Sequence, residues 1–280
     1  MAGGATWHGL DGAGWAARLG VPAVEVYDAL PSTNDRAQAL AASGAAVGTV
    51  VLADAQRAGR GRHGRAWASA PGAGVWCSVV ARPRDAAAAG VLALRVGLEL
   101  ADALAPLADP VPLTLKWPND VFAGDGKLAG ILLEARWQDG VPTHVVVGGV
   151  VNLRVPDDQP SAAALDRAAP PAVFAAVVEA ARRAARTAGP LSPDERARWA
   201  VRDRAVGRAV TSPGVGIVVG LAADGGLQVR GPDGLATFHA GSLRFACLPP
   251  RSPCCSFSMS ATPRPPSASA RARRCVITGG

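Results

Sequence analysis

The chain has 280 residues, 49% of them apolar, so it can bury a sizeable core in one large domain or in one large and one small domain. Its formal net charge is +7, but residues 249–280 hold five arginines and no acid, which leaves +2 on the rest of the chain. A nearly neutral body argues against a broad nucleic-acid-binding surface and favours a small anionic partner.

The sequence also gives little support for a membrane protein, a metal-binding site or a disulfide framework. The longest run without a charged residue, 37–53, contains Gly44 and Gly48 and falls short of the roughly 18 apolar residues that a membrane span needs. Five cysteines occur without zinc-ligand spacing or a disulfide framework. No apolar N-terminal leader is present either, so we expect a cytoplasmic protein.

The first informative stretch is a junction between a strand and a helix. Residues 24–30 alternate apolar and polar, which predicts a half-buried strand. Ser32, Thr33 and Asn34 follow, and either Ser32 or Thr33 can cap a helix that stops at Gly44. Capping alone would explain these residues, but three short polar groups at such a junction can also hydrogen-bond a polar ring.

A loop rich in glycine and arginine follows a second predicted strand at 49–53. Residues 57–65 hold four arginines and three glycines, a combination that suits a carboxylate or phosphate. The spacing also fits the dinucleotide fingerprint, but Pro71 and two nearby glycines forbid the long helix that this fingerprint requires. We therefore predict an anion-binding loop, with a solvated surface loop as the alternative.

The middle of the chain predicts further strands around a scaffold helix. Residues 75–80 predict a strand, and 86–107 predict a helix whose polar face carries Arg95, Glu99 and Asp102. A short strand within 113–118 then carries Lys116 and Trp117 to Pro118, and Asn119-Asp120 make a turn. Lys127 lies at the start of a strand at 127–135. Lone lysines at strand ends are usually solvated, but a lysine beside an anion-binding loop more often contacts the bound anion.

The remaining chain predicts a strand, two helices and a small β domain. The strand at 144–153 contains two glycines, a sign of close backbone approach, and helices are expected at 172–187 and 193–206. From Gly207 onward, four or five short apolar runs separated by turns predict a small barrel. We expect a lead-in at 1–23, a catalytic domain at 24–206, a small β domain at 207–248 and a disordered tail at 249–280.

The candidate chemistry relies on cations rather than on a nucleophile. None of the four histidines lies in a nucleophile motif, and no spaced pair of carboxylates stands out. A set of basic groups remains: Arg60, Arg62, Arg65, Lys116 and Lys127. Such groups act by position and charge stabilisation, which is typical of phosphoryl and nucleotidyl transfer.

Four motifs together resemble the biotin–protein ligase family, the biotin–[acetyl-CoA-carboxylase] ligases. The resemblance runs from about Val24 to Phe245, in the order of the family and close to its spacing. Its most specific parts are the Gly-Arg-Gly-Arg-x-Gly-Arg and Lys-Trp-Pro-Asn-Asp motifs. The four stretches are Ser32-Thr33-Asn34, residues 56–67, residues 116–120, and residues 127–132 with 148–152 behind them.

The resemblance implies an α+β fold, with a mixed sheet and packed helices as in class II synthetases, plus a small C-terminal SH3-like barrel. It also implies a reaction in which biotin and ATP, with Mg²⁺, give biotinyl-5′-AMP and pyrophosphate. A lysine of a biotin carboxyl carrier domain, as in acetyl-CoA carboxylase, then accepts the biotin. We expect a monomer or homodimer. We also expect no DNA binding, because the chain before Val24 is too short for the helix-turn-helix domain of some relatives.

The resemblance also assigns roles to individual residues. Arg62 and Lys127 are the catalytic candidates, reaching the carboxylate and the α-phosphate. The biotin-binding candidates are Ser32, Thr33, Asn34, Gln56, Gly59, Arg60, Gly61, Arg62, Lys127 and Gly130. The ATP-binding candidates are Arg62, Arg65, Trp67, Lys116, Asn119, Asp120 and Asn152.

Two competing functions stay open from the sequence. A lipoate or octanoate ligase of related fold would use a similar loop, although the polar Ser32-Thr33-Asn34 and Gln56 favour an acid that carries a ureido ring. A nucleic-acid-binding protein would instead use the loop and the arginine-rich tail, and its binding would depend strongly on salt.

Overall fold

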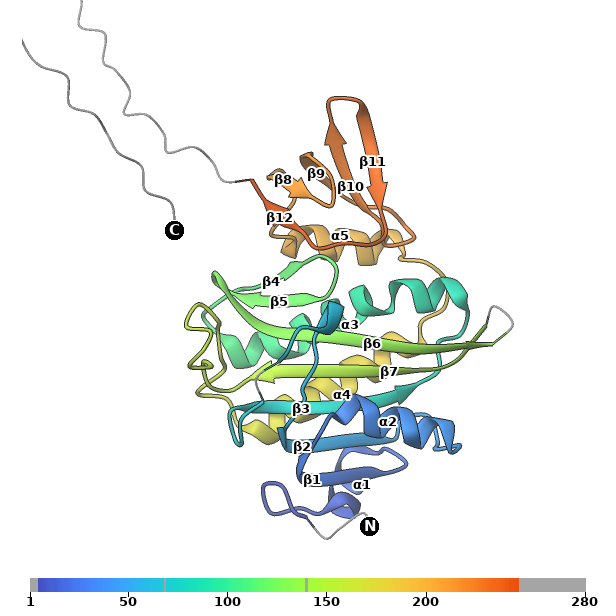
Figure 1. Ribbon diagram of the computed structural model, residues 1–280, viewed down its shortest axis with the longest axis vertical. Coiled ribbons are helices and arrows are strands. Elements are labelled where there is room, and N and C mark those ends of the chain that lie inside the picture. The colour runs from blue at the N-terminus through green and yellow to red at the C-terminus, as the bar shows by residue number, and fades with distance from the viewer. Residues whose placement is uncertain (1–4, 68, 139–140, 247–280) are drawn as a thin grey trace, which may run out of the picture. The chain divides into compact units, whose positions relative to one another are not determined.

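The computed structural model describes residues 5–67, 69–138 and 141–246 (Figure 1). Met1–Ala246 forms one compact unit that contains two sheets. The tail predicted to be disordered, 249–280, lies outside the described residues, and the boundary predicted at 206/207 inside this unit stays a prediction. Within the described part of the chain, none of the helices is long and apolar enough to cross a bilayer.

The larger sheet has seven strands. These are β1 (Val24–Leu30), β2 (Val50–Gln56), β3 (Gly74–Ala81), β4 (Leu113–Lys116), β5 (Asp120–Ala123), β6 (Gly126–Gln138) and β7 (Val141–Asn152). Their order is β1-β2-β3-β7-β6-β5-β4, with β1 and β2 parallel and the other neighbours antiparallel. The mixed sheet expected from the resemblance is confirmed.

Helices cover both faces of this sheet. On one face lies α2 (Thr33–Ala42); on the other lie α3 (Ala86–Ala108) and α4 (Pro170–Arg186) (Figure 1). Two adjacent glycines of β7 mark the two faces. A Cβ on Gly148 would meet Asn34 of α2, whereas a Cβ on Gly149 would meet Val177 of α4. The glycine pair therefore allows close helix approach on both sides, in agreement with the prediction for this strand.

The N-terminal segment is part of the core rather than a simple lead-in. Helix α1 (Gly12–Leu19) begins at the N-cap Asp11, whose side chain accepts a hydrogen bond from Gly14 N. Trp7 and Trp15 are buried and pack edge-on against Phe174 of α4, with ring centroids 5.6 and 5.1 Å apart. The two tryptophans give this segment enough apolar surface to dock.

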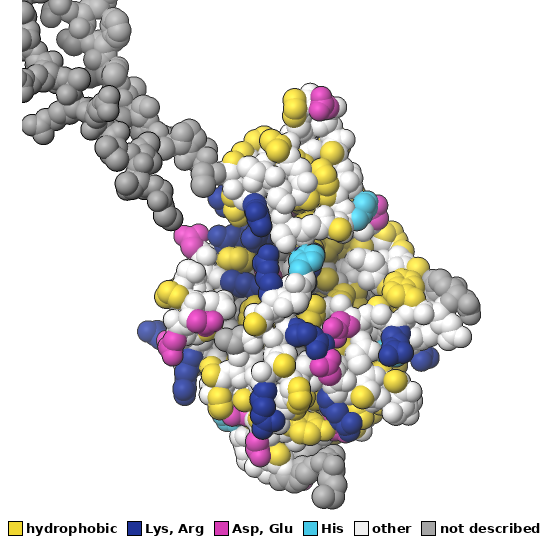
Figure 2. Space-filling view, in the orientation of Figure 1, with side chains coloured by type: hydrophobic (Ala, Val, Ile, Leu, Met, Phe, Trp, Pro, Cys, Tyr) yellow, Lys and Arg dark blue, Asp and Glu magenta, His cyan; other side chains and the backbone are white. Residues whose placement is uncertain are grey.

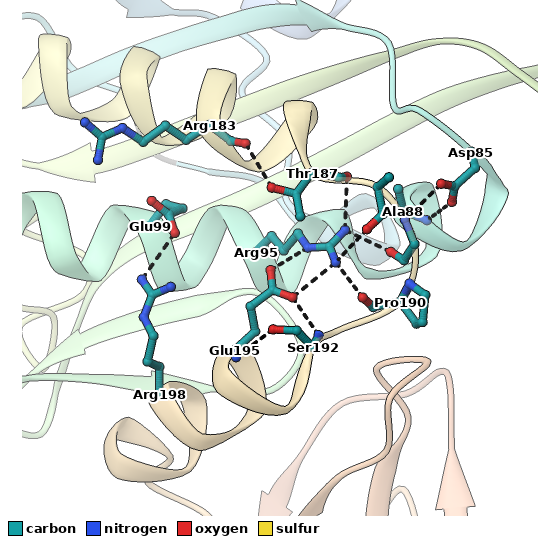
Figure 3. Close-up of polar contacts among 12 residues, drawn as sticks. Asp85, Ala88, Arg95, Glu99, Arg183, Thr187, Pro190, Ser192, Glu195 and Arg198 are labelled. Carbon is teal, nitrogen blue, oxygen red and sulfur yellow. Dashed lines mark hydrogen bonds and ion pairs between the residues drawn. The ribbon is translucent and has the colours of Figure 1, made fainter.

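Arg95 of α3 is a buried charged residue, which differs from the sequence-based prediction. The helix was predicted to carry Arg95 on a polar face with Glu99 and Asp102, but the Arg95 side chain is only 2% exposed. It donates to Glu195 of helix α5 (Pro193–Arg202) at 2.6 and 3.2 Å, and to backbone carbonyls of residues 187–190 (Figure 3). These acceptors satisfy the guanidinium, and this explains why a charged residue occupies a core position. Helix α5 ends four residues earlier than predicted.

The smaller sheet is antiparallel and lies at the C-terminal end of the described chain. Its strands are β8 (Ala209–Ser212), β9 (Gly216–Leu221), β10 (Leu227–Gly231), β11 (Gly234–Phe238) and β12 (Arg244–Phe245). Their order is β11-β10-β9-β8-β12. A small C-terminal β unit is thus confirmed, and its closure into an SH3-like barrel stays a prediction. The last strand, β12, was not anticipated from the sequence.

The turn between β9 and β10 contacts segments outside the smaller sheet directly. The Trp117 indole N–H, next to the end of β4, donates to the carbonyl oxygen of Gly225 at 3.0 Å, and Leu191 N donates to Ala223 O at 2.7 Å. A Cβ on Gly225 would approach Leu94 of α3 to 2.7 Å. The β9–β10 turn is thereby docked against α3, and the segment before β12 reaches the site described next.

Candidate functional site

A cavity of about 440 Å³ opens on the face of the larger sheet that carries α2. Its walls come from the α2 N-terminus, the glycine-arginine loop, strands β4 to β7, and the segment before β12. The lining residues predicted from the sequence are Ser32, Thr33, Asn34, Gln56, Arg60, Gly61, Arg62, Arg65, Trp67, Lys116, Asn119, Asp120, Lys127 and Gly130. Most of the predicted site residues are therefore brought together, although they span almost a hundred positions.

One end of the cavity is neutral and polar. Ser32 is the N-cap of α2, its Oγ accepting from Asp35 N at 3.4 Å, so capping accounts for this residue. Thr33 donates through its backbone N–H and its hydroxyl to Gln56 Oε1, at 2.8 and 3.1 Å. Both residues also line the cavity, so capping does not prevent them from facing a ligand.

Asn34 is fixed by two residues that the sequence analysis did not select. The Ser78 hydroxyl lies 2.6 Å from Asn34 Oδ1 and 2.8 Å from Thr33 Oγ1, and Asn34 Nδ2 donates to Glu134 Oε2 at 3.1 Å. Ser78 is fully buried. A single hydroxyl in an otherwise apolar buried strand was the available signal for Ser78, because buried polar groups require partners.

Arg60 forms a bridge across the mouth of this polar end. It donates two hydrogen bonds to Asp35 of α2, at 2.8 and 2.5 Å, and one to Glu134 of β6, at 3.2 Å. The sequence predicted Arg60 as a direct contact for the ligand ring. The structure places it on the cavity wall with its charge already matched by two carboxylates.

The glycine-arginine loop is held in a tight, largely non-helical shape. Its only helical turn is the three-residue η1 (Arg62–Gly64), in which His63 and Gly64 take positive φ values of 58° and 71°. Gly61 N donates to Arg65 O at 2.7 Å, and Trp67 N donates to Gly59 O at 2.9 Å. The absence of a dinucleotide-type helix within this described loop agrees with the sequence analysis.

The opposite end of the cavity is cationic. Figure 2 shows Lys and Arg side chains gathered between the C-terminal strands and β4–β5. The cavity-lining cations of this end are Arg62, Arg65, Lys116, Lys127 and Arg244. Among the described lining residues, Asp120 is the one carboxylate that faces them. An anionic ligand would relieve the repulsion among these cations.

Burial at this end lowers the pKa of two basic side chains, Lys116 and Arg62. Desolvation lowers the pKa of Lys116 below its ordinary value, and the nearby charges of Lys127, Arg204 and Arg65 act in the same direction while Asp120 opposes them. Desolvation likewise lowers the pKa of Arg62. The Lys116 amine lies 6.0 and 5.9 Å from the centres of the Phe122 and Phe245 rings, an arrangement that favours its charged form.

Lys127 and Asp120 form an ion pair at the floor of the cationic end. Lys127 Nζ lies 2.7 Å from Asp120 Oδ1 and 4.8 Å from the centre of the Trp67 ring. A Cβ on Gly130 would lie 3.4 Å from Lys127 Nζ and 3.6 Å from Trp67. These are ordinary van der Waals distances, so Gly130 lies in direct contact range of both the Lys127 and Trp67 side chains.

Arg62 connects the loop to the C-terminal unit. Its guanidinium donates to Asn119 Oδ1 at 3.3 Å and to Gly241 O at 3.0 Å. Asn119 in turn donates to Ile131 O at 2.7 Å. The segment that follows Gly241 contributes Ser242, Leu243 and Arg244 to the cavity wall, a contribution that sequence reasoning missed.

Two predicted site residues do not line the cavity. Gly59 is buried in the loop, where a Cβ would lie 2.6 Å from Trp67 O, so its lack of a side chain permits loop closure. Asn152 is buried behind the wall and donates to the carbonyl oxygens of Lys127 and Ala163, at 3.3 and 3.1 Å. Asn152 therefore contacts the backbone of Lys127 and Ala163 rather than the cavity itself.

The donor set fits a magnesium ion that arrives with a nucleotide. No group of three or more His, Cys, Asp or Glu residues that could hold a metal occurs in the described ranges. Mg²⁺ commonly keeps several waters and binds through one or two carboxylates plus substrate phosphates. Asp120 supplies one such carboxylate at the cationic end.

Comparison with known proteins agrees with the motifs. Residues 26–152 match the model of the "Biotin/lipoate A/B protein ligase family". A biotin–[acetyl-CoA-carboxylase] ligase of Mycobacterium tuberculosis is 46% identical over 128 residues, which cover 44% of this chain and 46% of that protein. A protein of the same name from Paracoccus denitrificans is 42% identical over 144 residues, which cover 51% and 58% of the two chains. The chain thus spans about half the length of these relatives.

Solved structures extend the likeness to the whole fold. Biotin protein ligase from Aquifex aeolicus in complex with biotin and ATP superposes with a TM-score of 0.66 at 25% identity, covering 80% of this chain and 99% of that one. Biotin protein ligase from Leishmania major shares the fold, with a TM-score of 0.53 at 22% identity. The resemblance inferred from the motifs is confirmed.

Proposed function

We propose that this chain, whose residues 26–152 form a domain of the biotin/lipoate A/B protein ligase family, is an ATP-dependent biotin–protein ligase. The observation that carries the proposal is the polarity of the cavity. Neutral hydrogen-bonding groups line one end and five cations line the other. This arrangement suits a molecule with a polar, uncharged ring and a carboxylate, lying beside a nucleotide.

The polar end would hold the ureido ring. Thr33, Asn34 and Gln56 present hydroxyl and amide groups there. Hydrogen bonds between Thr33 and Gln56, and between Asn34 and both Ser78 and Glu134, fix their orientation before a ligand enters. Lipoate has no ureido group to satisfy these polar groups, so biotin is the better match. Arg60 and Ser32 complete this wall.

The cationic end would catalyse the first step. An oxygen of the biotin carboxylate attacks the α-phosphorus of ATP, a new C–O–P linkage forms, and the bond to pyrophosphate breaks. Two anionic groups must approach each other, and Arg62 and Lys127 would offset their repulsion. Arg65, Trp67, Lys116, Asn119 and Asp120 are the nucleotide-side candidates. Bound Mg²⁺ would supply further charge neutralisation on the phosphates.

The second step would transfer biotin to a protein. The amine of a lysine attacks the carbonyl carbon of the mixed anhydride, an amide forms, and AMP leaves. We assign the acceptor to a biotin carboxyl carrier domain, such as that of acetyl-CoA carboxylase. A cytoplasmic location belongs to the same proposal.

Exchange of labelled pyrophosphate into ATP tests the first step. With the full chain and Mg²⁺, we expect exchange that depends on biotin and is absent with lipoate. Exchange with lipoate alone would reassign the chain to the lipoate or octanoate ligases. Folded protein that catalyses exchange with neither acid would contradict the ligase proposal.

A further inference from the structure

Arg60 is a cavity-lining cation whose charge is already matched within the protein. Both of its terminal nitrogens bond to Asp35, and one of them also bonds to Glu134. The two carboxylates come from different elements, α2 and β6. Neither carboxylate is among the described lining residues, whereas at the cationic end five lining cations share the single lining carboxylate, Asp120. The two ends of the cavity therefore differ in charge although both carry arginine.

Glu134 has a second contact that links this charge balance to the polar end. While one oxygen accepts from Arg60, the other accepts from Asn34 Nδ2 at 3.1 Å. The oxygen of the same Asn34 amide faces the Ser78 hydroxyl at 2.6 Å. Glu134 thus fixes which way the Asn34 amide points while it also holds Arg60.

Strand geometry places Glu134 where it can do both. Gly130, Leu132 and Glu134 alternate along β6 and share one face of the strand, and the first two line the cavity. Leu132 pairs with Gly148 of β7, whose missing side chain leaves room for Asn34. A carboxylate at the end of this row is therefore adjacent to the ring end of the cavity.

We propose that Asp35 and Glu134 are positioning and specificity-determining residues that neutralise Arg60 and thereby make the ring end of the cavity accept an uncharged group. An acid entering the cavity would then direct its carboxylate toward Arg62 and Lys127, where it has to react. This inference rests on the proposed function for the identity of the ligand, but the charge preference of the ring end can be measured by itself.

The test frees Arg60 and asks whether the ring end begins to bind a second carboxylate. The variant carries Asp35→Asn and Glu134→Gln, and the glutamine keeps an oxygen that can accept from Asn34. Azelate, a linear dicarboxylate, is the probe, because its two charged ends would occupy both ends of the cavity. Calorimetric titration of azelate and of biotin, without ATP, requires no catalysis. Glu25→Gln is the matched control, since Glu25 also pairs with an arginine, Arg36, but lies outside the cavity.

We expect the double variant to bind azelate at least about threefold more tightly than the wild type, and biotin about two- to fivefold more weakly, in line with the modest strength of partly exposed ion pairs. The Glu25→Gln control should bind both as the wild type does. Unchanged azelate affinity in a folded double variant would overturn the inference. Asp35→Asn alone, on the exposed side of Arg60, repeats the test if the double variant does not fold. Failure of the wild type to bind biotin would instead count against the proposed function.

Discussion

Lys127 Nζ lies 2.7 Å from Asp120 Oδ1, and this ion pair joins the neighbouring strands β6 and β5 at the cationic end of the cavity. The pair holds the ammonium group over the Trp67 ring without burying it fully. Lys127 is therefore oriented before any ligand enters, as a catalytic charge should be.

Replacing Lys127 by alanine should separate binding from chemistry. We expect Lys127→Ala to bind biotin measurably but to form the adenylate on the order of 10²–10³ times more slowly, because one preorganised charge is lost. Calorimetry measures the binding, and pyrophosphate exchange measures the adenylation. Near-normal adenylate formation would reject this role.

Arg62 is expected to retain the reactive adenylate. It is anchored to Asn119 and to Gly241 O, so its removal opens the loop toward the C-terminal unit. Arg62→Gly should release biotinyl-AMP into solution faster than the wild type. The control is Arg57→Gly, which removes an exposed arginine from the same loop outside the cavity wall. An unchanged rate of release would argue against retention by Arg62.

Gly148→Ala should weaken ligand binding at the polar end of the cavity without changing the cationic end. The new Cβ would lie 2.3 Å from Asn34 Oδ1, so the amide has to move away from Ser78. We expect biotin affinity to fall about tenfold, the equivalent of about 1.4 kcal/mol. Gly90→Ala is the matched control, because a Cβ there meets nothing within 4 Å. Equal biotin affinities for the two variants would contradict this account.

Arg95 should matter for stability rather than for binding. Arg95→Leu would leave Glu195 without its cation and unpair carbonyl groups of residues 187–190, at a cost of about 3–5 kcal/mol of unfolding free energy. Urea unfolding measures this loss. The exposed pair of Arg183 with Glu179 provides the control, and Arg183→Leu should leave the unfolding midpoint nearly unchanged. A small loss of unfolding free energy in Arg95→Leu would contradict this prediction, because it would mean that the unpaired groups find other partners.

The same cluster predicts how stability depends on pH. Burial acts to raise the pKa of Glu195, but hydrogen bonds from Arg95 and Ser192 N outweigh it and hold the pKa below its ordinary value of 4.5. The resulting stability is present above pH 4.5 and is lost as the pH falls through the lower pKa of the folded state. Glu195→Gln should therefore flatten the decline of the urea midpoint below about pH 4.5. The same decline in variant and wild type would assign acid sensitivity to other carboxylates.

Local sequence predicted most of the helices and strands, and the family motifs indicated most of the residues that line the cavity. The alternation in 24–30, the cap at Ser32 and the glycine-broken loop each depend on neighbours in the chain, so their form was predictable. Lys127 was placed correctly at the start of a strand for the same reason. The mixed sheet was expected from the family resemblance of the motifs. The small β unit was predicted from short apolar runs separated by turns.

Tertiary structure decided which groups those residues meet. Glu134 reaches Arg60 and Asn34 across sequence separations of 74 and 100 residues, and Ser78 reaches Asn34 across 44. Sheet order and register create these contacts, and neither is encoded in any local pattern. The burial of Arg95 was missed for the same reason. Helical spacing shows on which face of a helix a residue lies, but it does not show that Glu195 and backbone carbonyls will surround that residue.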